Sequence, residues 1–262
     1  MSIRKNISNL SPYDIELLRN KFAENNQYKK FKELYKKGVP EIKNRNTNNL
    51  WSKKFTKIET INEKDMMTKE KISYIASFLK SQNEKFKLLD IGIGQAYLEQ
   101  ELTNRGIKLQ LSAVDISELS IERVKKKYKG EAHTADALTI KKLFKPKSFD
   151  VIVAIEVIEH IPPHQIFSLY KQAYQLLKPG GLFIISTPTN ENLSEMKTNP
   201  NAHVREYTIP ILKTEFELNR FEILNIKTHV AFQTLYRFKK ILMHIFPNRW
   251  KPNNIIVIAK KV

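Results

Sequence analysis

The sequence predicts an α/β fold in which a mostly parallel sheet of seven strands carries helices on both faces. Short apolar runs of strand length alternate with longer amphipathic stretches of helical length. Two glycines, Gly92 and Gly94, follow the first apolar run and precede a helical stretch, as in a strand–turn–helix unit. Acidic residues stand at the ends of several successive runs, and parallel strands bring such ends to one edge of the sheet.

The predicted elements follow one another in a regular order. An amphipathic helix over Thr68–Leu79 precedes the first strand, because its apolar residues recur at helical spacing. The predicted strands cover Phe86–Ile91, Leu109–Ile116, Ala132–Thr134, Phe149–Ile155, Leu182–Thr187, Phe221–His229 and Asn254–Ala259. The predicted helices between them cover Tyr97–Arg105, Ser117–Tyr128, Gln165–Leu177 and Ile209–Asn219. Such alternation is typical of right-handed crossovers in a parallel sheet.

Residues 1–66 are predicted to form an N-terminal helical extension or lid, and residues 67–262 the main domain. The extension is polar and lacks a strand-like run, and its short helices are expected over Tyr13–Phe22 and Tyr28–Tyr35. Trp51 and Phe55 are four residues apart and share one helical face. Two interpretations of this face stay open: it lies over a site, or it simply docks on the main domain.

A further helix is predicted as an insertion at about residues 232–247, between the last two strands. Its apolar residues exceed one stripe and are flanked by Arg237, Lys239 and Lys240. A basic amphipathic helix suits a membrane surface or a lipophilic substrate. Packing on the sheet or on a second subunit are the alternatives, and the oligomeric state stays undetermined.

The chain has 262 residues and a formal charge of +18, and the basic excess is spread along its length. No acidic residue follows Glu222. The charge favours an anionic partner such as RNA, an acidic membrane surface or a phosphorylated metabolite, and general compositional bias is the alternative. The absence of cysteine excludes disulfides and cysteine metal sites. Without an apolar run of membrane-spanning length or a signal peptide, the expected location is cytoplasmic.

The organising motif is Asp90-Ile-Gly92-Ile-Gly94, at the end of the first predicted strand. A carboxylate there would repel a pyrophosphate, whereas it suits a positively charged nucleoside that carries an amine, such as S-adenosylmethionine. The motif resembles the first motif of the class I S-adenosylmethionine-dependent methyltransferases. Ala96 stands at the third small position, where a glycine is usual. The resemblance covers about Ile72 to Pro188, and it includes the turn Lys178-Pro179-Gly180-Gly181 before the fifth strand.

This resemblance implies a Rossmann-like sheet of seven strands, mostly parallel with an antiparallel last strand, and S-adenosylmethionine as cofactor. It implies that an acid at the end of the second strand accepts the ribose hydroxyls and that an acid after the third strand meets the adenine amino group. The cofactor-binding residues implied in this way are Asp90, Gly92, Gly94, Asp115, Ile116, Asp136, Ala137 and Glu156.

The stretch Glu156-Val-Ile-Glu159-His160 follows the fourth strand. In a helical turn its two carboxylates and imidazole would point the same way and suit a divalent cation. The string resembles that of metal-dependent 2′-O-methyltransferases of small RNAs and of O-methyltransferases of ubiquinone biosynthesis. That likeness implies that Glu156, Glu159, His160 and a later residue, His203, are ligands of Mg²⁺ or Mn²⁺. The alternatives are a metal-free catalytic role for His160 and His203, or structural roles.

The function predicted from the sequence is S-adenosylmethionine-dependent methyl transfer to a hydroxyl of a small acceptor. A quinol, a sugar unit or a lipid-linked molecule would serve as that acceptor. Two alternatives stay open: a 2′-O-methyltransferase acting on RNA, favoured by the charge, and a non-catalytic scaffold that binds the cofactor.

Overall fold

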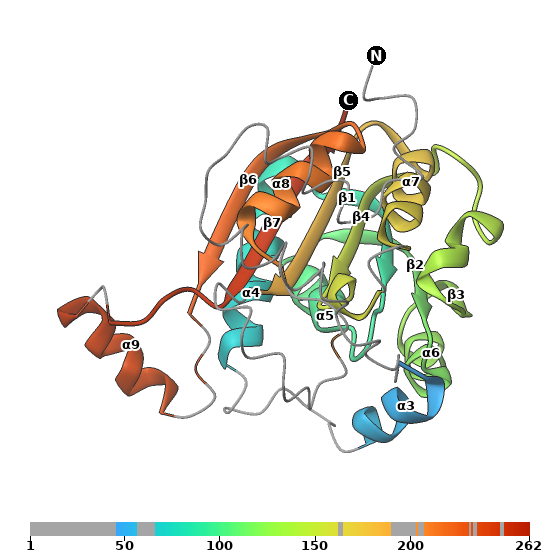
Figure 1. The fold of residues 1–262 in the computed structure, drawn as a ribbon. Coiled ribbons are helices and arrows are strands. Elements are labelled where there is room, and N and C mark those ends of the chain that lie inside the picture. The colour runs from blue at the N-terminus through green and yellow to red at the C-terminus, as the bar shows by residue number, and fades with distance from the viewer. Residues whose placement is uncertain are drawn as a thin grey trace, which may run out of the picture.

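The computed structural model describes residues 46–56, 66–161, 165–189, 203, 207–230, 232, 235–246 and 249–262. Within them, seven strands form one sheet in the order β3-β2-β1-β4-β5-β7-β6 (Figure 1). The strands are β1 (Lys85–Ile91), β2 (Lys108–Asp115), β3 (Gly130–Thr134), β4 (Phe149–Ile155), β5 (Leu177–Pro188), β6 (Phe221–His229) and β7 (Asn254–Lys261). The pairs from β3 to β5 are parallel, and β7 is antiparallel to both of its neighbours. The predicted fold class is confirmed.

Helices cover both faces of the sheet and form two separate apolar cores. The described helices are α3 (Asn48–Thr56), α4 (Met66–Gln82), α5 (Tyr97–Asn104), α6 (Glu118–Lys127), α7 (Ile166–Leu176), α8 (Ile209–Leu218), α9 (Tyr236–Ile245) and the 3₁₀ turns η4 (Ala137–Lys142) and η5 (Ile158–His160). Apolar residues of α4, α5 and α6 pack on one face of the sheet, and those of α7 and α8 pack on the other. The central strands are therefore buried on both sides, which explains their continuous Val- and Ile-rich sequences.

Several elements differ in length from those predicted. Strand β5 begins at Leu177, which pairs with Phe149 before a shift in register, so the predicted turn Lys178–Gly181 lies within the strand. Gly180 takes a left-handed conformation there, with φ of 71°. Helix α4 is longer than predicted and α9 is shorter. The deviations lie at element ends, where tertiary pairing rather than local pattern decides the boundary.

Of the predicted N-terminal extension, the structure describes α3, the two residues before it and Met66, the first residue of α4. Ser52 Oγ lies 3.0 Å from Ser117 Oγ, and Arg123 donates to the Phe55 carbonyl oxygen at 2.9 Å. Helix α3 is therefore fixed to α6 (Figure 1). The helices predicted over Tyr13–Phe22 and Tyr28–Tyr35 lie outside the described residues, and the division at residue 66 stays a prediction.

Among the described residues, no helix combines the length and the apolar character needed to cross a membrane.

Candidate functional site

The glycine turn after β1 closes against residues from two other parts of the chain. Gly92 and Gly94 both have positive φ, 77° and 51°, a backbone conformation that residues with a Cβ atom rarely adopt. A Cβ on Gly92 would collide with the Val157 side chain, and one on Gly94 would lie 3.3 Å from Phe55 Cζ. The Gly94 N–H also donates to Asp115 Oδ2 at 2.8 Å. The turn is thus held by the neighbouring strand and covered by α3.

Two adjoining cavities open at the carboxyl ends of the parallel strands. The first measures about 140 Å³ and includes Asp115, Ile116, Asp136 and Ala137 in its walls. The second measures about 350 Å³ and is lined by Asp90, Gly94, Lys71, Glu159 and His203 among others. The cavities share the wall residues Trp51, Phe55, Gly92, Glu156 and His160. The residues implied as cofactor ligands and those implied as metal ligands therefore meet at one composite site.

Asp115 is the central acid of the first cavity. Its Oδ1 accepts a hydrogen bond from the Ser117 N–H at 2.7 Å, while Oδ2 holds Gly94. Burial raises the pKa of Asp115, and these two backbone donors oppose the shift. Each carboxylate oxygen keeps a lone pair for a further donor. Asp136 is exposed at the start of η4, where its Oδ1 accepts from the Leu138 N–H at 2.8 Å.

Asp90 is buried under the turn beside a second acid that the sequence did not single out. Glu99, on the first turn of α5, is fully buried, and Asp90 and Glu99 interact through their carboxyl groups. Burial, and then Glu99, raise the pKa of Asp90 well above its usual range, and burial raises the pKa of Glu99. Burial and Glu99 also raise the pKa of Tyr128 to about 12. Asp90 is therefore one half of a buried acid pair in which burial favours the protonated forms.

Replacing Glu99 with glutamine is expected to flatten the pH dependence of stability. An acid whose pKa is raised by folding keeps a proton that the unfolded chain releases, so stability falls as pH rises above the unfolded pKa. Glutamine removes this titration and still donates a hydrogen bond to Asp90. Urea unfolding from pH 5 to pH 9 measures the effect, with the exposed Glu122→Gln as control. Equal slopes for the wild type and Glu99→Gln would contradict a raised pKa of Glu99 in the folded protein.

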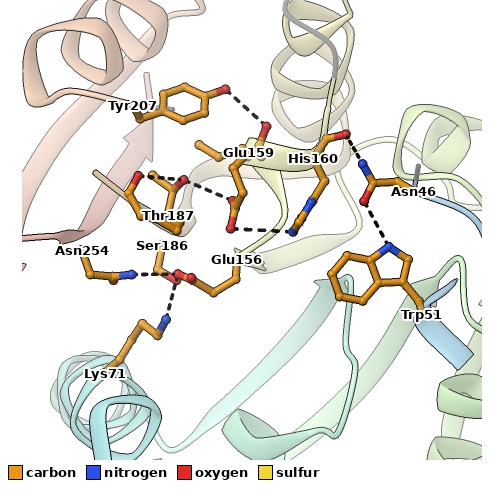
Figure 2. A network of polar contacts seen from close by, with 12 residues as sticks. Asn46, Trp51, Lys71, Glu156, Glu159, His160, Ser186, Thr187, Tyr207 and Asn254 are labelled. Carbon is orange, nitrogen blue, oxygen red and sulfur yellow. Dashed lines mark hydrogen bonds and ion pairs between the residues drawn. The ribbon is translucent and has the colours of Figure 1, made fainter. Parts of the chain in front are cut away.

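The chain leaves β4 through a residue in a left-handed conformation, Glu156, with φ of 56°. Its N–H donates to the Ser186 carbonyl oxygen at 2.9 Å. Glu156 Oε1 lies 2.8 Å from the buried Lys71 Nζ, 2.8 Å from Ser186 Oγ and 3.2 Å from Asn254 Nδ2 (Figure 2). Burial acts to raise the pKa of Glu156, but Lys71 and these donors hold it below its usual value. Glu156 is thus an ionised carboxylate, neutralised inside the protein.

The expectation that one helical turn gathers Glu156, Glu159 and His160 is wrong for Glu156. Only residues Ile158–His160 form a helical turn, and the left-handed backbone at Glu156 sends its side chain toward Lys71 instead (Figure 2). The other three residues of the predicted ligand set do come together. One ligand atom from each of Glu159, His160 and His203 lies within 4.8 Å of the others.

Glu159 is a buried acid with little charge compensation of its own. Its Oε2 accepts from Thr187 Oγ1 at 3.1 Å, and its Oε1 lies 3.9 Å from His160 Nε2 (Figure 2). Burial, and then the negative charge of Glu156, raise the pKa of Glu159 well above its usual value. Desolvation lowers the pKa of His203 below that of an exposed histidine. Burial therefore favours the protonated form of Glu159 and the neutral form of the His203 imidazole.

Aromatic rings link this cluster to α3. The His160 ring contacts Trp51 edge to face at a centroid distance of 4.8 Å and His203 at 5.0 Å. Trp51 Nε1 donates to Asn46 Oδ1, and Asn46 Nδ2 donates to the His160 carbonyl oxygen, both at 3.2 Å (Figure 2). Trp51 and Phe55 line both cavities, and the helix that carries them also docks on α6, so each of the two interpretations describes part of the arrangement.

Sequence reasoning missed Lys71, Glu99 and Asn254. The sequence does indicate that Lys71 is unusual, because this lysine precedes Ile75 by four residues and so lies on the apolar face of its helix. A lysine in that position is buried only if it finds a partner. Asn254 gave no local signal, since its contact with Glu156 joins residues 98 positions apart.

Comparison with known proteins identifies a family to which this chain is similar. Residues 48–241 match the family model of a methyltransferase domain. A ubiquinone biosynthesis O-methyltransferase of Rickettsia prowazekii (strain Madrid E) is 27% identical over 196 residues, which are 71% of this chain and 75% of that protein. Its counterpart from Idiomarina loihiensis is 32% identical over 105 residues, 38% of this chain. That match spans only 42% of the Idiomarina protein.

Solved structures agree at the level of the fold. A methyltransferase of Archaeoglobus fulgidus described as SAM-dependent superimposes with a TM-score of 0.58 and 19% identity, covering 81% of this chain and 98% of that one. Magnesium protoporphyrin IX methyltransferase of Synechocystis PCC 6803, solved with bound SAH, gives a TM-score of 0.59 and 14% identity, covering 81% and 93%.

Proposed function

Because this chain belongs to the S-adenosylmethionine-dependent methyltransferases, we propose that it methylates a hydroxyl oxygen of a small acceptor molecule. The relatives named as ubiquinone biosynthesis O-methyltransferases support an acceptor of the quinol type. The observation that carries the proposal is the placement of His203 and His160 in the wall of the cavity that the glycine turn also lines, where desolvation lowers the pKa of His203.

In this proposal the first cavity takes the nucleoside. The lone pairs left on Asp115 accept the ribose hydroxyls, and Asp136 at the mouth accepts from the adenine amino group. The backbone at Gly92, which lines both cavities, leaves room for the chain that joins the nucleoside to the sulfonium. The cofactor supplies an electrophilic methyl group on a positively charged sulfur.

The second cavity takes the acceptor. For transfer to oxygen, a bound cofactor would supply the methyl group and keep the electron pair of its carbon–sulfur bond, while residues of this chain orient the acceptor hydroxyl and take its proton. The hydroxyl proton moves to the His203 imidazole, which is neutral because desolvation lowers its pKa. His160, held between Trp51 and His203, positions the base and limits the space around the acceptor.

A second candidate, methylation of an RNA 2′-hydroxyl assisted by Mg²⁺ or Mn²⁺, is favoured by the convergence of Glu159, His160 and His203. These three residues would hold the cation, which would acidify the acceptor hydroxyl. Glu156 does not belong to this set, since Lys71 already neutralises it. The raised pKa of Glu159 also disfavours the ionised form that a cation would need as ligand.

A methyl-transfer assay with labelled S-adenosylmethionine separates the two candidates. Catechols, quinols and short RNA are offered as acceptors, with and without EDTA, and the products are identified by mass spectrometry. We expect an O-methylated catechol or quinol at a rate that EDTA leaves unchanged. Label found only in RNA, or turnover abolished by EDTA and restored by Mn²⁺, would overturn the metal-free proposal in favour of the second candidate.

A further inference from the structure

Helix α9 presents an apolar stripe to solvent. Phe238, Ile241, Leu242 and Ile245 follow one another at positions i, i+3, i+4 and i+7, so they share one face of the helix. The exposed fractions of Phe238, Ile241 and Ile245 are 58%, 63% and 62%. In a helix of a folded domain this pattern normally faces the core. Here it faces outward, from a helix set apart from the sheet beyond β6 and β7 (Figure 1).

The opposite face of α9 fixes this orientation. Tyr236 is buried against Val230 and Phe232, and Met243 packs against the same small cluster. Lys240 Nζ lies 2.8 Å from Glu70 Oε2 on α4. The helix is thus attached through one face. These contacts hold the helix in an orientation in which its apolar stripe points away from the protein.

The charge around the stripe points to the kind of partner. Arg237 and Lys239 lie on either side of it along the helix, and no acidic residue follows Glu222 in the chain. A second copy in a symmetric dimer would bring two such positive faces together. RNA would satisfy the charge, but the stripe is mostly aliphatic and offers few flat rings on which bases stack. An anionic lipid surface satisfies both the charge and the apolar stripe.

We propose that α9 docks the enzyme on an anionic lipid bilayer, with Phe238, Ile241, Leu242 and Ile245 buried among the acyl chains and the basic residues at the head groups. A helix of ten residues is about 15 Å long and therefore lies in the plane of the membrane instead of crossing it. Glu70, which holds α9, is adjacent to Lys71 in the second cavity. Docking would therefore bring the acceptor cavity close to the lipid surface.

Vesicle flotation with the full-length protein tests this proposal. We expect binding to vesicles of phosphatidylcholine with 30% phosphatidylglycerol, weaker binding to phosphatidylcholine alone, and loss of the difference at high salt. The double variant Phe238→Ser with Ile241→Ser should bind at least about tenfold more weakly to both vesicles, since it removes two buried apolar side chains. Arg237→Gln should weaken binding to the anionic vesicles alone, by roughly fivefold.

Leu224→Ser on β6 is the matched control, because it removes a leucine that is 43% exposed but lies outside α9. Its vesicle binding should equal that of the wild type. Unaltered S-adenosylmethionine affinity in every variant shows that the fold is intact. Vesicle binding that survives the double serine variant would overturn the proposal. So would a dimer that this variant dissociates in the absence of lipid, or RNA binding that Arg237→Gln abolishes while vesicles are not bound.

Discussion

Replacing Asp115 with alanine is expected to lower the affinity for S-adenosylmethionine about 100-fold or more. The carboxylate has two roles that alanine removes together. In the proposed complex it accepts hydrogen bonds from the ribose hydroxyls, and such bonds to a charged group contribute roughly 1.5 to 3 kcal/mol each. In the protein alone it holds the N–H groups of Gly94 and Ser117. Isothermal titration calorimetry with S-adenosylmethionine measures the loss.

Two further variants separate these roles from a general loss of stability. Asp115→Asn keeps one acceptor oxygen and the size of the side chain, so its loss of affinity should be intermediate. Asp150→Asn changes an acid at the opposite end of the sheet, which accepts from the Lys87 N–H and pairs with Lys178, and should leave affinity unchanged. Wild-type affinity in Asp115→Ala would mean that the nucleoside does not lie in the first cavity.

Replacing His203 with glutamine is expected to lower kcat by about 100-fold or more, with little change in the affinity for S-adenosylmethionine. Loss of a positioned general base typically has an effect of this size. Because His203 lines the second cavity and not the first, the defect should appear in kcat and not in cofactor binding. His133→Gln on β3, outside both cavities, is the control.

The same variant tests a pH profile whose sign follows from the structure. A general base acts only when it is unprotonated, and desolvation lowers the pKa of His203 below the usual 6.5. Wild-type kcat should therefore be constant at neutral pH and fall only as the pH drops below 6.5. The residual activity of His203→Gln should lack this acidic decline. A decline of the same midpoint in both proteins would assign the titration to another group.

The sequence predicted well the parts of the site that depend on local pattern. An acid after a buried strand, as at Asp90 and Asp115, reaches the carboxyl edge of a parallel sheet whatever the rest of the chain does. The two glycines likewise predicted a tight turn, and Gly92 and Gly94 both have the positive φ that such a turn requires. These residues therefore lie in the walls of two cavities that meet, as the spacing of the motifs led us to expect.

The parts that failed depend on contacts between distant segments. The conformation at Glu156 follows from its N–H bond to Ser186 and its ion pair with Lys71, and neither is visible in the stretch 156–160 by itself. The prediction of one helical turn for Glu156, Glu159 and His160 therefore failed at Glu156, which is not helical. The pairing of Asp90 with Glu99 was not predicted for a related reason, because the burial of Glu99 depends on how α5 packs on the sheet.

The placement of α3 has a consequence for the order of events in each turnover. Trp51 and Phe55 belong to the walls of both cavities, so one lifting movement of α3 would open the donor and the acceptor compartments together. Spent cofactor and methylated product would then leave through the same opening. The hydrogen bonds of Asn46 to Trp51 and to the His160 carbonyl oxygen would have to break in that movement.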